Sequence, residues 1–324
     1  MSKAIRIDKT GGPEVMKWVD VEVGEPGEGQ VLLEQTACGL NYIDVYFRTG
    51  LYPQPLPAGL GMEAAGVVKA VGPGVTSLKV GERVAYTGRP CGAYAQQRVM
   101  RADQLIRLPD AISDEDGASI MLQGLTAQYL LRRTYRVKPG DTILIQAAAG
   151  GVGLLVCQWA KALGATVIGT VGSDEKAQIA KAHGCDHPIV YTREDFTARV
   201  REITHGAGVP VVYDSIGKDT YVKSLDCLSP LGMFVSFGNS SGPLPPIDSS
   251  EFAGRGSLFF TRPTLFTYMA KRADYEEMCA ELFDVVASGK VKTSINQRYA
   301  LEDVAQAHAD LEARRTTGST ILIP

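Results

Sequence analysis

Residues 142–153 read TILIQAAAGGVG, a short β-type run that ends in a turn of small residues and leads into a helical pattern. The turn at 147–153 follows A-x-x-G-x-x-G, and its place between a strand and a helix is what the dinucleotide-binding fingerprint requires. Small residues let the backbone approach a pyrophosphate, while the helix N-terminus supplies N–H groups and a favourable dipole. The stretch therefore predicts a bound dinucleotide, in preference to a tight turn without a ligand.

Strand and helix patterns alternate onward from this turn, which predicts βαβ units and a parallel sheet. The expected strands are 142–146, 166–171, 189–191, 209–214 and 233–237, and the expected helices are 152–163, 174–183, 195–204 and 221–228.

The flanking parts of the chain have a different character. Before residue 100, short β-type runs broken by Gly and Pro predict a compact, barrel-like β domain, and a helix is expected at 113–133. The pattern of the C-terminal residues predicts two helices and a last strand, and this segment is expected to rejoin the N-terminal domain. The expected strands are 15–23, 30–36, 64–71, 83–87, 94–100 and 319–323, and the helices of the tail are 265–288 and 301–314.

Composition excludes several classes of function. The 324 residues carry 33 Lys and Arg against 36 Asp and Glu, with no dense basic run, so nucleic acid is not an expected partner. No apolar run is long enough to span a bilayer and no signal peptide is recognisable, which predicts a cytoplasmic protein. The six cysteines form no C-x-x-C pair and are expected to be reduced, and all four histidines lie beyond residue 182.

The end of the second predicted strand bears on the choice of coenzyme. An NAD site usually has an acidic residue there for the ribose 2′-hydroxyl, but residues 170–173 read TVGS. Lys176 and Ser173 are suited to a 2′-phosphate, so NADPH is favoured over NADH. Lys176 has the alternative of being a solvated helix residue. Asp174 and Glu175 are interpreted as partners of the helix dipole.

Seven segments carry a resemblance to a known family: GLNYID at 39–44, GLYP at 50–53, GMEAAG at 61–66, AAAGGVG at 147–153, GTVG at 169–172, VSFGNSSG at 235–242 and GS at 318–319. Together they resemble the zinc-free, zeta-crystallin-like quinone oxidoreductases of the medium-chain dehydrogenase/reductase superfamily. The resemblance covers essentially the whole chain. It implies an α/β fold with a GroES-like β-barrel catalytic domain at 1–123 and 264–324, and a Rossmann-type doubly wound nucleotide-binding domain at 124–263.

The same resemblance implies that no metal is bound. Zinc-dependent relatives carry a ligand Cys where this chain has Asn41, and Gly-His-Glu where this chain reads GME at 61–63. They also carry a four-cysteine zinc lobe, of which only Cys91 has a counterpart here.

Coenzyme contacts are implied by the resemblance at positions in both domains. Lys176, Tyr191 and Arg314 are expected around the 2′-phosphate, with Arg315 as the alternative to Arg314. Tyr191 has the alternative of capping a strand, and Phe260 that of packing in the core. The full set of implied contacts is Asn41, Asp44, Thr126, Tyr129, Ala149, Gly150, Gly151, Val152, Gly153, Gly172, Ser173, Lys176, Tyr191, Ser215, Phe237, Gly238, Ser240, Phe260, Thr261 and Arg314.

The expected reaction is reduction of a quinone by NADPH, as hydride or as single electrons, because a quinone is electrophilic enough to need no Lewis-acid metal. Asn41, Tyr46 and Tyr52 are expected to line the acceptor pocket as hydrogen-bond donors. Tyr46 has the alternative of barrel packing, and Glu63 is either a proton relay or a structural partner. Cys38 is expected in the core.

Two other functions stay open. Related zinc-free enzymes reduce activated C=C bonds of enones or enals, and zeta-crystallin-like proteins can have an RNA-binding or structural role. The physiological acceptor is not determined by the sequence. The resemblance also implies a homodimer formed through the nucleotide-binding domain, with 257–260 as a candidate edge strand.

Overall fold

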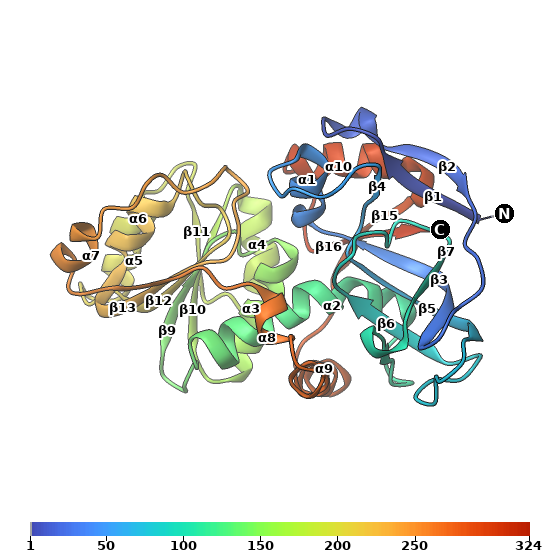
Figure 1. Ribbon diagram of the computed structural model, residues 1–324. Helices are drawn as coiled ribbons and strands as arrows, with labels where there is room; N and C mark the ends of the chain where they lie inside the picture. Colours follow the sequence, from blue (N-terminus) through green and yellow to red (C-terminus); the bar gives the residue numbers. More distant parts are fainter. Residues whose placement is uncertain (1) are drawn as a thin grey trace. The chain divides into compact units, whose positions relative to one another are not determined.

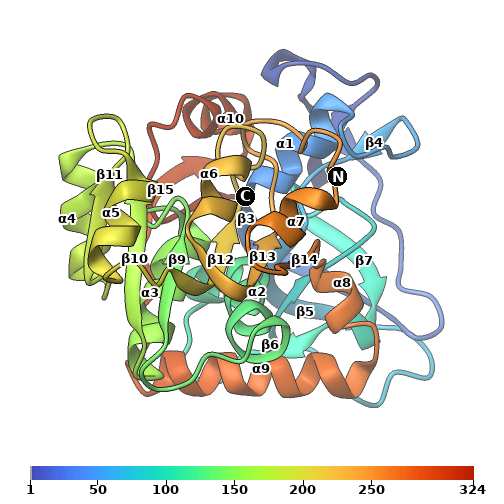
Figure 2. The same cartoon turned by 90° about the vertical axis from the view of Figure 1, so that its left-hand side faces the viewer.

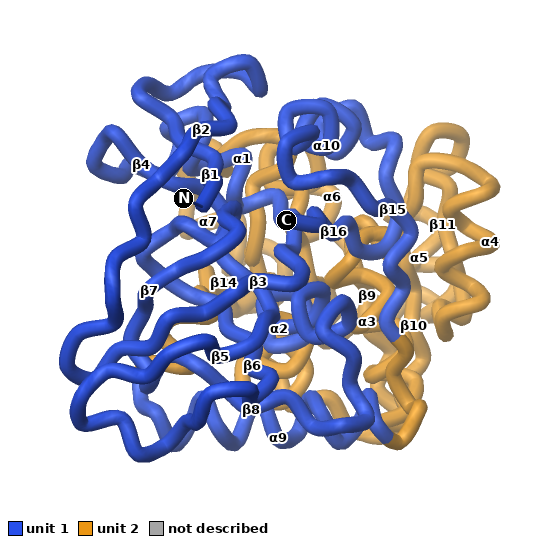
Figure 3. The backbone as a smooth tube through the Cα atoms, turned by 90° about the vertical axis from the view of Figure 1, so that its right-hand side faces the viewer, with its two compact units in different colours: residues 1–125, 271–287, 293–324 blue, residues 126–270, 288–292 orange. Residues whose placement is uncertain are grey.

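The computed structural model describes residues 2–324, which divide into two compact units (Figure 3). Unit 1 contains the chain up to Leu125 together with Lys271–Ala287 and Thr293–Pro324. Unit 2 contains Thr126–Ala270 and Ser288–Lys292. The first boundary lies close to the expected 123/124, and the return to unit 1 comes later than the expected 263/264.

Unit 2 is built on a six-stranded, all-parallel sheet with the order β11-β10-β9-β12-β13-β14. In chain order this is 3-2-1-4-5-6, the order of doubly wound dinucleotide-binding sheets. The order reverses between β9 and β12, so a ligand crevice is expected at the carboxyl ends of these two strands. The strands are β9 (Thr142–Ile145), β10 (Thr166–Val171), β11 (His187–Val190), β12 (Val209–Asp214), β13 (Leu228–Ser236) and β14 (Phe259–Thr261).

Helices cover both faces of this sheet, α3 and α4 on one and α5 and α6 on the other (Figure 1). Apolar side chains of the strands and helices meet in a core that includes Leu144, Ile168, Val212 and Phe234. Burial on both faces explains why the strands are continuous apolar runs. The helices are α3 (Gly151–Ala162), α4 (Asp174–Ala182), α5 (Phe196–Ile203), α6 (Tyr221–Asp226), α7 (Ser250–Gly254) and α8 (Leu265–Tyr268).

Unit 1 contains two sheets that are largely antiparallel. The larger has the order β15-β16-β3-β5-β6-β8 with β7 paired to β3, and the smaller has the order β2-β1-β4. Its strands are β1 (Ser2–Ile7), β2 (Lys17–Val21), β3 (Gln30–Leu40), β4 (Ala58–Gly59), β5 (Glu63–Val71), β6 (Arg83–Thr87), β7 (Gln97–Arg101), β8 (Ile106–Arg107), β15 (Ile295–Ala300) and β16 (Ser319–Ile323).

Strand β16 comes from the end of the chain and pairs antiparallel with β3, as the predicted return of the tail to the N-terminal domain requires. The helices are α1 (Tyr42–Thr49), α2 (Asp114–Tyr129, which runs from unit 1 into unit 2), α9 (Arg272–Ala287) and α10 (Val304–Glu312). Short 3-10 turns lie at Pro13–Val15, Ala102–Gln104 and Leu301–Asp303, and a π-helical turn, Leu130–Thr134, follows α2.

Most predicted elements agree with the structure, and the strands at 83–87, 166–171, 209–214 and 319–323 are confirmed residue for residue. The single helix predicted at 265–288 is wrong, because the segment forms two helices, α8 and α9 (Figure 2). Tyr268 of α8 stacks on Tyr129 within unit 2, while Met278 and Leu282 of α9 are buried in unit 1. The two halves of the segment thus pack in different cores.

Several other predicted elements also differ from the structure in their bounds. The helix expected at 113–133 changes to a π-helical turn after Tyr129, and the helix expected at 301–314 begins with a 3-10 turn and ends at Glu312. The strand expected at 94–100 begins only at Gln97. Within residues 2–324 we find no helix whose length and hydropathy would let it cross a membrane.

Candidate active site

The glycine-rich turn joins β9 to α3 and brings five of the expected coenzyme contacts together, from Ala149 to Gly153. Ala147 has a left-handed φ of 57°, and its carbonyl accepts a hydrogen bond of 3.0 Å from Gly150 N. A Cβ at Gly153 would lie 2.3 Å from the same carbonyl oxygen, so only glycine fits there. The first N–H groups of α3 have no acceptor within the helix, which leaves them available to an anion at this turn.

The end of β10 brings Gly172, Ser173, Lys176 and Tyr191 together. Ser173 is the N-cap of α4 and accepts a 3.3 Å hydrogen bond from Lys176 N. A Cβ at Gly172 would lie 3.2 Å from the Tyr191 hydroxyl. The backbone therefore approaches Tyr191 closely at the strand end where a Rossmann-type fold receives the adenosine ribose.

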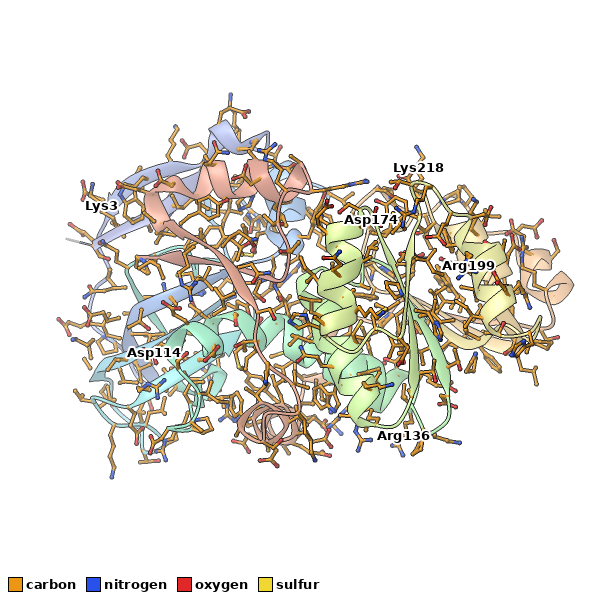
Figure 4. All side chains as sticks on the ribbon, turned by 180° about the vertical axis from the view of Figure 1, so that it is seen from behind. Lys3, Asp114, Arg136, Asp174, Arg199 and Lys218 are labelled. Carbon is orange, nitrogen blue, oxygen red and sulfur yellow. The ribbon has the colours of Figure 1, made fainter. Side chains whose placement is uncertain are left out.

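An exposed ion pair lies beside this strand end. Arg193 donates two hydrogen bonds to the carboxylate of Asp174, at 2.5 and 2.6 Å. These hydrogen bonds hold the pKa of Asp174 below its ordinary value. Asp174 is the first residue of α4 and is labelled in Figure 4. Its pairing with Arg193 was not predicted.

The end of β12 is joined to the start of α6 by a buried polar network around Asp214, which sequence reasoning missed. One oxygen of this carboxylate accepts from Ile216 N and Gly217 N, at 2.8 and 2.9 Å. The other accepts from the hydroxyls of Thr220 and Ser224, at 2.7 and 2.8 Å. Burial raises the pKa of Asp214, and the four hydrogen bonds act against that rise.

Backbone hydrogen bonds next to Asp214 bring the expected contacts on these two strand ends together. Phe237 N donates to Asp214 O at 2.8 Å, and Ser240 N donates to Ser215 O at 3.1 Å. Ser215, Phe237, Gly238 and Ser240 therefore form one cluster at the predicted crevice.

The remaining expected contacts of unit 2 lie apart from that cluster in the chain. Phe260 of β14 stacks on Phe234 with ring centroids 5.9 Å apart, and it is 40% exposed. This contact agrees with the alternative that Phe260 packs on the core. Thr261 is the next residue of β14 and pairs with Val235. Thr126 and Tyr129 are buried on α2.

In unit 1, Asn41 lies at the start of α1 with its amide buried and paired at both ends. Its Nδ2 donates to Glu63 Oε1 at 2.5 Å, and its Oδ1 accepts from Gln123 Nε2 at 3.1 Å. Glu63 is fully buried, and burial raises its pKa to about 8.

Asp44 is the end point of a second buried network. It accepts hydrogen bonds from Asn41 N at 2.9 Å and from the Tyr94 hydroxyl at 2.8 Å. Burial raises the pKa of Asp44 to about 7. The contact with Asn41 N is also why a helix begins here, since it satisfies an N–H group that has no partner inside α1. The N-x-x-D spacing of residues 41–44 was the available evidence for α1, which we did not predict.

His308 and Arg48 extend this network. Arg48 lies 3.0 Å from His308 Nδ1, which leaves Nε2 to donate to the Tyr94 hydroxyl at 3.3 Å. Burial and the charge of Arg48 lower the pKa of His308 to about 3, so the imidazole is neutral. Arg48 also donates to both oxygens of Glu312, at 2.8 and 2.9 Å.

Tyr46 and Tyr52 lie together, with ring centroids 5.1 Å apart. Tyr46 is buried and Tyr52 is half-buried, and Tyr52 N donates to Tyr46 O at 3.0 Å. The structure thus places both predicted pocket hydroxyls on one aromatic cluster at α1. Arg314, also in unit 1, is exposed, while Arg315 is held by Asp310 with a 2.9 Å hydrogen bond from its Nε.

The donor set around Asn41 does not fit zinc. The Asn41 amide is hydrogen-bonded to Glu63 and Gln123. Met62, at the position of the zinc-ligand His, is a buried thioether, and the Cys38 thiol donates to Ala93 O at 2.8 Å. Burial raises the pKa of Cys38 to about 12, which disfavours the thiolate that zinc requires. Across residues 2–324, no group of three or more His, Cys, Asp or Glu residues is placed to hold a metal ion.

Two family models match the chain. Residues 27–110 match the alcohol dehydrogenase GroES-like domain, and residues 151–284 match a model described as zinc-binding dehydrogenase. Together with the six-stranded parallel sheet of unit 2, these matches define the class of protein as a medium-chain dehydrogenase/reductase.

Similar proteins narrow the class. The chain is 52% identical to a quinone oxidoreductase of Pseudomonas aeruginosa over the full length of both, and 50% identical to a 2-haloacrylate reductase of a Burkholderia species over 99% of that protein. It superposes with a TM-score of 0.97 on the solved Escherichia coli quinone oxidoreductase in complex with NADPH, at 49% identity, covering 99% of this chain and all of that one. The chain belongs to the quinone oxidoreductase family, which confirms the resemblance seen in the sequence.

Proposed function

We propose that this protein catalyses the NADPH-dependent reduction of quinones. The observation that carries the proposal is the end of β10, where Gly172 closely approaches the Tyr191 hydroxyl, Ser173 caps the helix that carries Lys176, and no acidic residue occupies the ribose position. Relatives about half identical over their full length are named quinone oxidoreductases, and solved neighbours hold NADPH, which supports both the acceptor and the coenzyme.

The coenzyme is proposed to bind along the carboxyl edge of the parallel sheet. The glycine turn would receive the pyrophosphate, and Gly172, Ser173, Lys176 and Tyr191 the adenosine 2′-phosphate, with Arg314 from unit 1. The nicotinamide side would be bounded by Asn41, Asp44, Thr126, Tyr129, Ser215, Phe237, Gly238, Ser240, Phe260 and Thr261. When bound, NADPH supplies the reducing equivalents, as hydride or as single electrons.

The residues of unit 1 would handle the acceptor. The overall reaction converts quinone, NADPH and one proton into hydroquinone and NADP⁺, so negative charge develops on a quinone oxygen. The Asn41 amide and the hydroxyls of Tyr46 and Tyr52 are neutral hydrogen-bond donors suited to stabilise that charge in a buried site.

Reduction of an activated C=C bond is the second candidate. It is favoured by the 50% identity to a 2-haloacrylate reductase over nearly the whole of both chains. The same donors would stabilise the enolate or carboxylate oxygen of such a substrate, so a panel of acceptors must separate the two reactions.

The oligomeric state and location belong to the proposal as well. The edge strand β14 carries Phe259 and Phe260, 57% and 40% exposed, and Leu231 nearby in the sheet is 67% exposed. We expect this apolar edge to pair with a second copy of the chain, and we expect the protein in the cytoplasm.

The test is NADPH and NADH oxidation by purified, chelator-treated protein across a panel of quinones, enones and 2-haloacrylates. We expect the highest kcat/KM with a quinone, and a preference for NADPH over NADH.

Lys176→Ala should weaken NADPH binding about tenfold, because one charge-assisted hydrogen bond is lost, and should leave NADH binding unchanged. Lys181→Ala, at the other end of α4, is the matched control. If Lys176→Ala keeps the NADPH preference of the wild type, the assignment of the 2′-phosphate contacts is wrong. If the wild type has a higher kcat/KM with a 2-haloacrylate than with any quinone, the proposed acceptor is wrong.

A further inference from the structure

A buried chain of hydrogen bonds runs through unit 1 and passes through Asn41. Ser319 Oγ donates to Gln123 Oε1 at 2.8 Å, and Gln123 Nε2 donates to Asn41 Oδ1 at 3.1 Å. Asn41 Nδ2 then donates to Glu63 Oε1 at 2.5 Å. All four residues are buried. Each residue in this chain donates to the next, from Ser319 to Glu63. The four residues are far apart in the sequence, so only the tertiary fold brings them together.

Glu63 ends this chain and is held from a second side. Its other oxygen, Oε2, accepts a hydrogen bond of 2.6 Å from Leu122 N of α2. Gly39 of β3 makes room for the carboxylate, because a Cβ there would lie 2.3 Å from Glu63 Oε1. Both oxygens of Glu63 therefore accept from N–H groups in a space shaped to the carboxylate.

This arrangement fixes which way the Asn41 amide faces. A side-chain amide can exchange its oxygen and nitrogen by a flip, and only its partners decide between the two orientations. Gln123 offers Asn41 a donor and Glu63 offers an acceptor, so the two partners specify the same orientation. The second N–H of the Asn41 amide is then fixed in direction as well, and that group is the proposed donor to the reacting quinone.

We propose that Glu63 is a positioning residue for the reaction: as an ionised carboxylate it holds the Asn41 amide in the orientation that donates to the acceptor, and protonation of Glu63 releases that orientation. The inference rests on the proposed function of Asn41. Glu63 does not touch the substrate in this role, and it transfers no proton. Protonation turns one Glu63 oxygen into an O–H group that faces another donor, so the hydrogen bond at that oxygen is weakened.

The surroundings of Glu63 set the pH at which this happens. Burial raises the pKa of Glu63 to about 8, and the negative charge of Asp44 acts in the same direction. Three other titratable groups face Glu63: Cys38 of β3, Tyr275 of α9, and Tyr94, which precedes β7. None of these becomes positively charged. Because the active form is deprotonated, kcat should rise with pH along a one-proton limb centred near 8.

Three variants test this assignment. For each, kcat is measured between about pH 6 and about pH 9 with saturating NADPH and 1,4-naphthoquinone, and the KM for NADPH is measured with the NADPH concentration varied. Glu63→Gln keeps the shape but cannot accept from both N–H groups. It should lower kcat about tenfold or more at high pH, lose the limb near 8, and change the KM for NADPH by less than about threefold. Asp44→Asn keeps Glu63 but removes a neighbouring negative charge, so the limb should move to lower pH.

Thr87→Val is the matched control. Thr87 pairs directly with Glu63 across β5 and β6, and its buried hydroxyl has no hydrogen-bond partner within residues 2–324. The variant should keep the wild-type kcat and pH profile. A Glu63→Gln protein that retains both the kcat and the limb of the wild type would overturn the assignment, and so would a limb that disappears in Asp44→Asn while it persists in Glu63→Gln.

A second measurement does not depend on turnover or on the folding of Glu63→Gln. In a ¹H–¹⁵N correlation spectrum of the wild-type protein, the side-chain amide of Asn41, assigned by its loss in Asn41→Ser, should shift with a midpoint near the pKa of about 8. An amide that does not shift contradicts the inference even if quinone is reduced. An amide that titrates in a protein with no quinone turnover supports the coupling of Glu63 to Asn41 and contradicts the proposed function.

Discussion

At the scale of single residues, the Asp174–Arg193 pair bears on coenzyme choice. Asp174 is adjacent to Ser173 at the start of α4, so its carboxylate lies beside the proposed 2′-phosphate contacts. Its two hydrogen bonds from Arg193 neutralise a charge that would otherwise repel the phosphate. The pair is exposed, so its effect should be modest and should depend on salt.

We predict that Arg193→Ala weakens NADPH binding about threefold to tenfold at low salt, because it uncovers the Asp174 carboxylate. Binding of NADH, which lacks the phosphate, should change less. The measurement is fluorescence titration of both coenzymes at two salt concentrations. The double variant Asp174→Asn/Arg193→Ala should regain most of the lost affinity. If it does not, Arg193 acts on the phosphate directly and the screening argument is wrong.

At the scale of elements, Arg48 links three parts of unit 1. Its side chain is 1% exposed and bonds to Glu312 at the end of α10, to His308 in α10, and to Gly11 O before the first 3-10 turn. Figure 1 shows α1 and α10 next to each other. A buried cation with this many partners specifies how α1 is seated, and α1 carries Asp44 and Tyr46.

We predict that Arg48→Met lowers the free energy of unfolding by about 2 to 3 kcal/mol, because it leaves Gly11 O and His308 Nδ1 without their donor and removes the partner of the half-buried Glu312 carboxylate. Urea denaturation followed by circular dichroism measures the loss. Arg101→Met, which removes an exposed pair with Asp103 in the same unit, is the control and should leave the free energy of unfolding nearly unchanged. Equal losses in the two variants would show that the buried network adds no stability.

At the scale of the whole molecule, the exposed edge strand β14 is the feature that a monomer leaves unexplained. Such edges are prone to pair with a further strand unless charge or a cover prevents it. Phe259→Lys places a charge on that edge. We predict that light scattering gives twice the 34.7 kDa chain mass for the wild type and 34.7 kDa for the variant. Val222→Lys, on α6 with a side chain 51% exposed, should stay dimeric. A wild-type mass of one chain contradicts the expected dimer.

Prediction from the sequence was most accurate where local pattern and tertiary packing agree. Strands β10 and β12 are apolar runs bounded by turns, so burial on both faces left one interpretation, and their bounds were predicted residue for residue. The segment 265–288 has one continuous helical pattern but contributes to two cores, and no local pattern reports which core a residue joins. Helix α1 was missed for a different reason, since the local N-x-x-D spacing that marks its start at Asn41 and Asp44 was not used.

In the candidate site, some residues were recognised from the sequence and others were missed. The glycine turn, Ser173 and Lys176 were recognised because their roles follow from backbone sterics and from position at a strand end. The side-chain partners of Asn41 and the Tyr94 partner of Asp44 were not recognised, because they are 22 to 82 residues away and their contacts exist only after the strands and helices are assembled. The partners of Asp214 lie within ten residues of it, and this local turn between β12 and α6 was missed. The coenzyme contacts themselves remain predictions.

The sequence by itself determined the class of fold, the dinucleotide turn and the resemblance to quinone oxidoreductases, because these depend on residue type and on spacing within about a dozen residues. Only the tertiary structure decided the pKa of the Glu63 carboxyl and the hydrogen bonds that it accepts. Its pKa and its hold on Asn41 arise from burial among β3, α1 and α2, and the free energy of a buried charge depends on surroundings that no single segment contains.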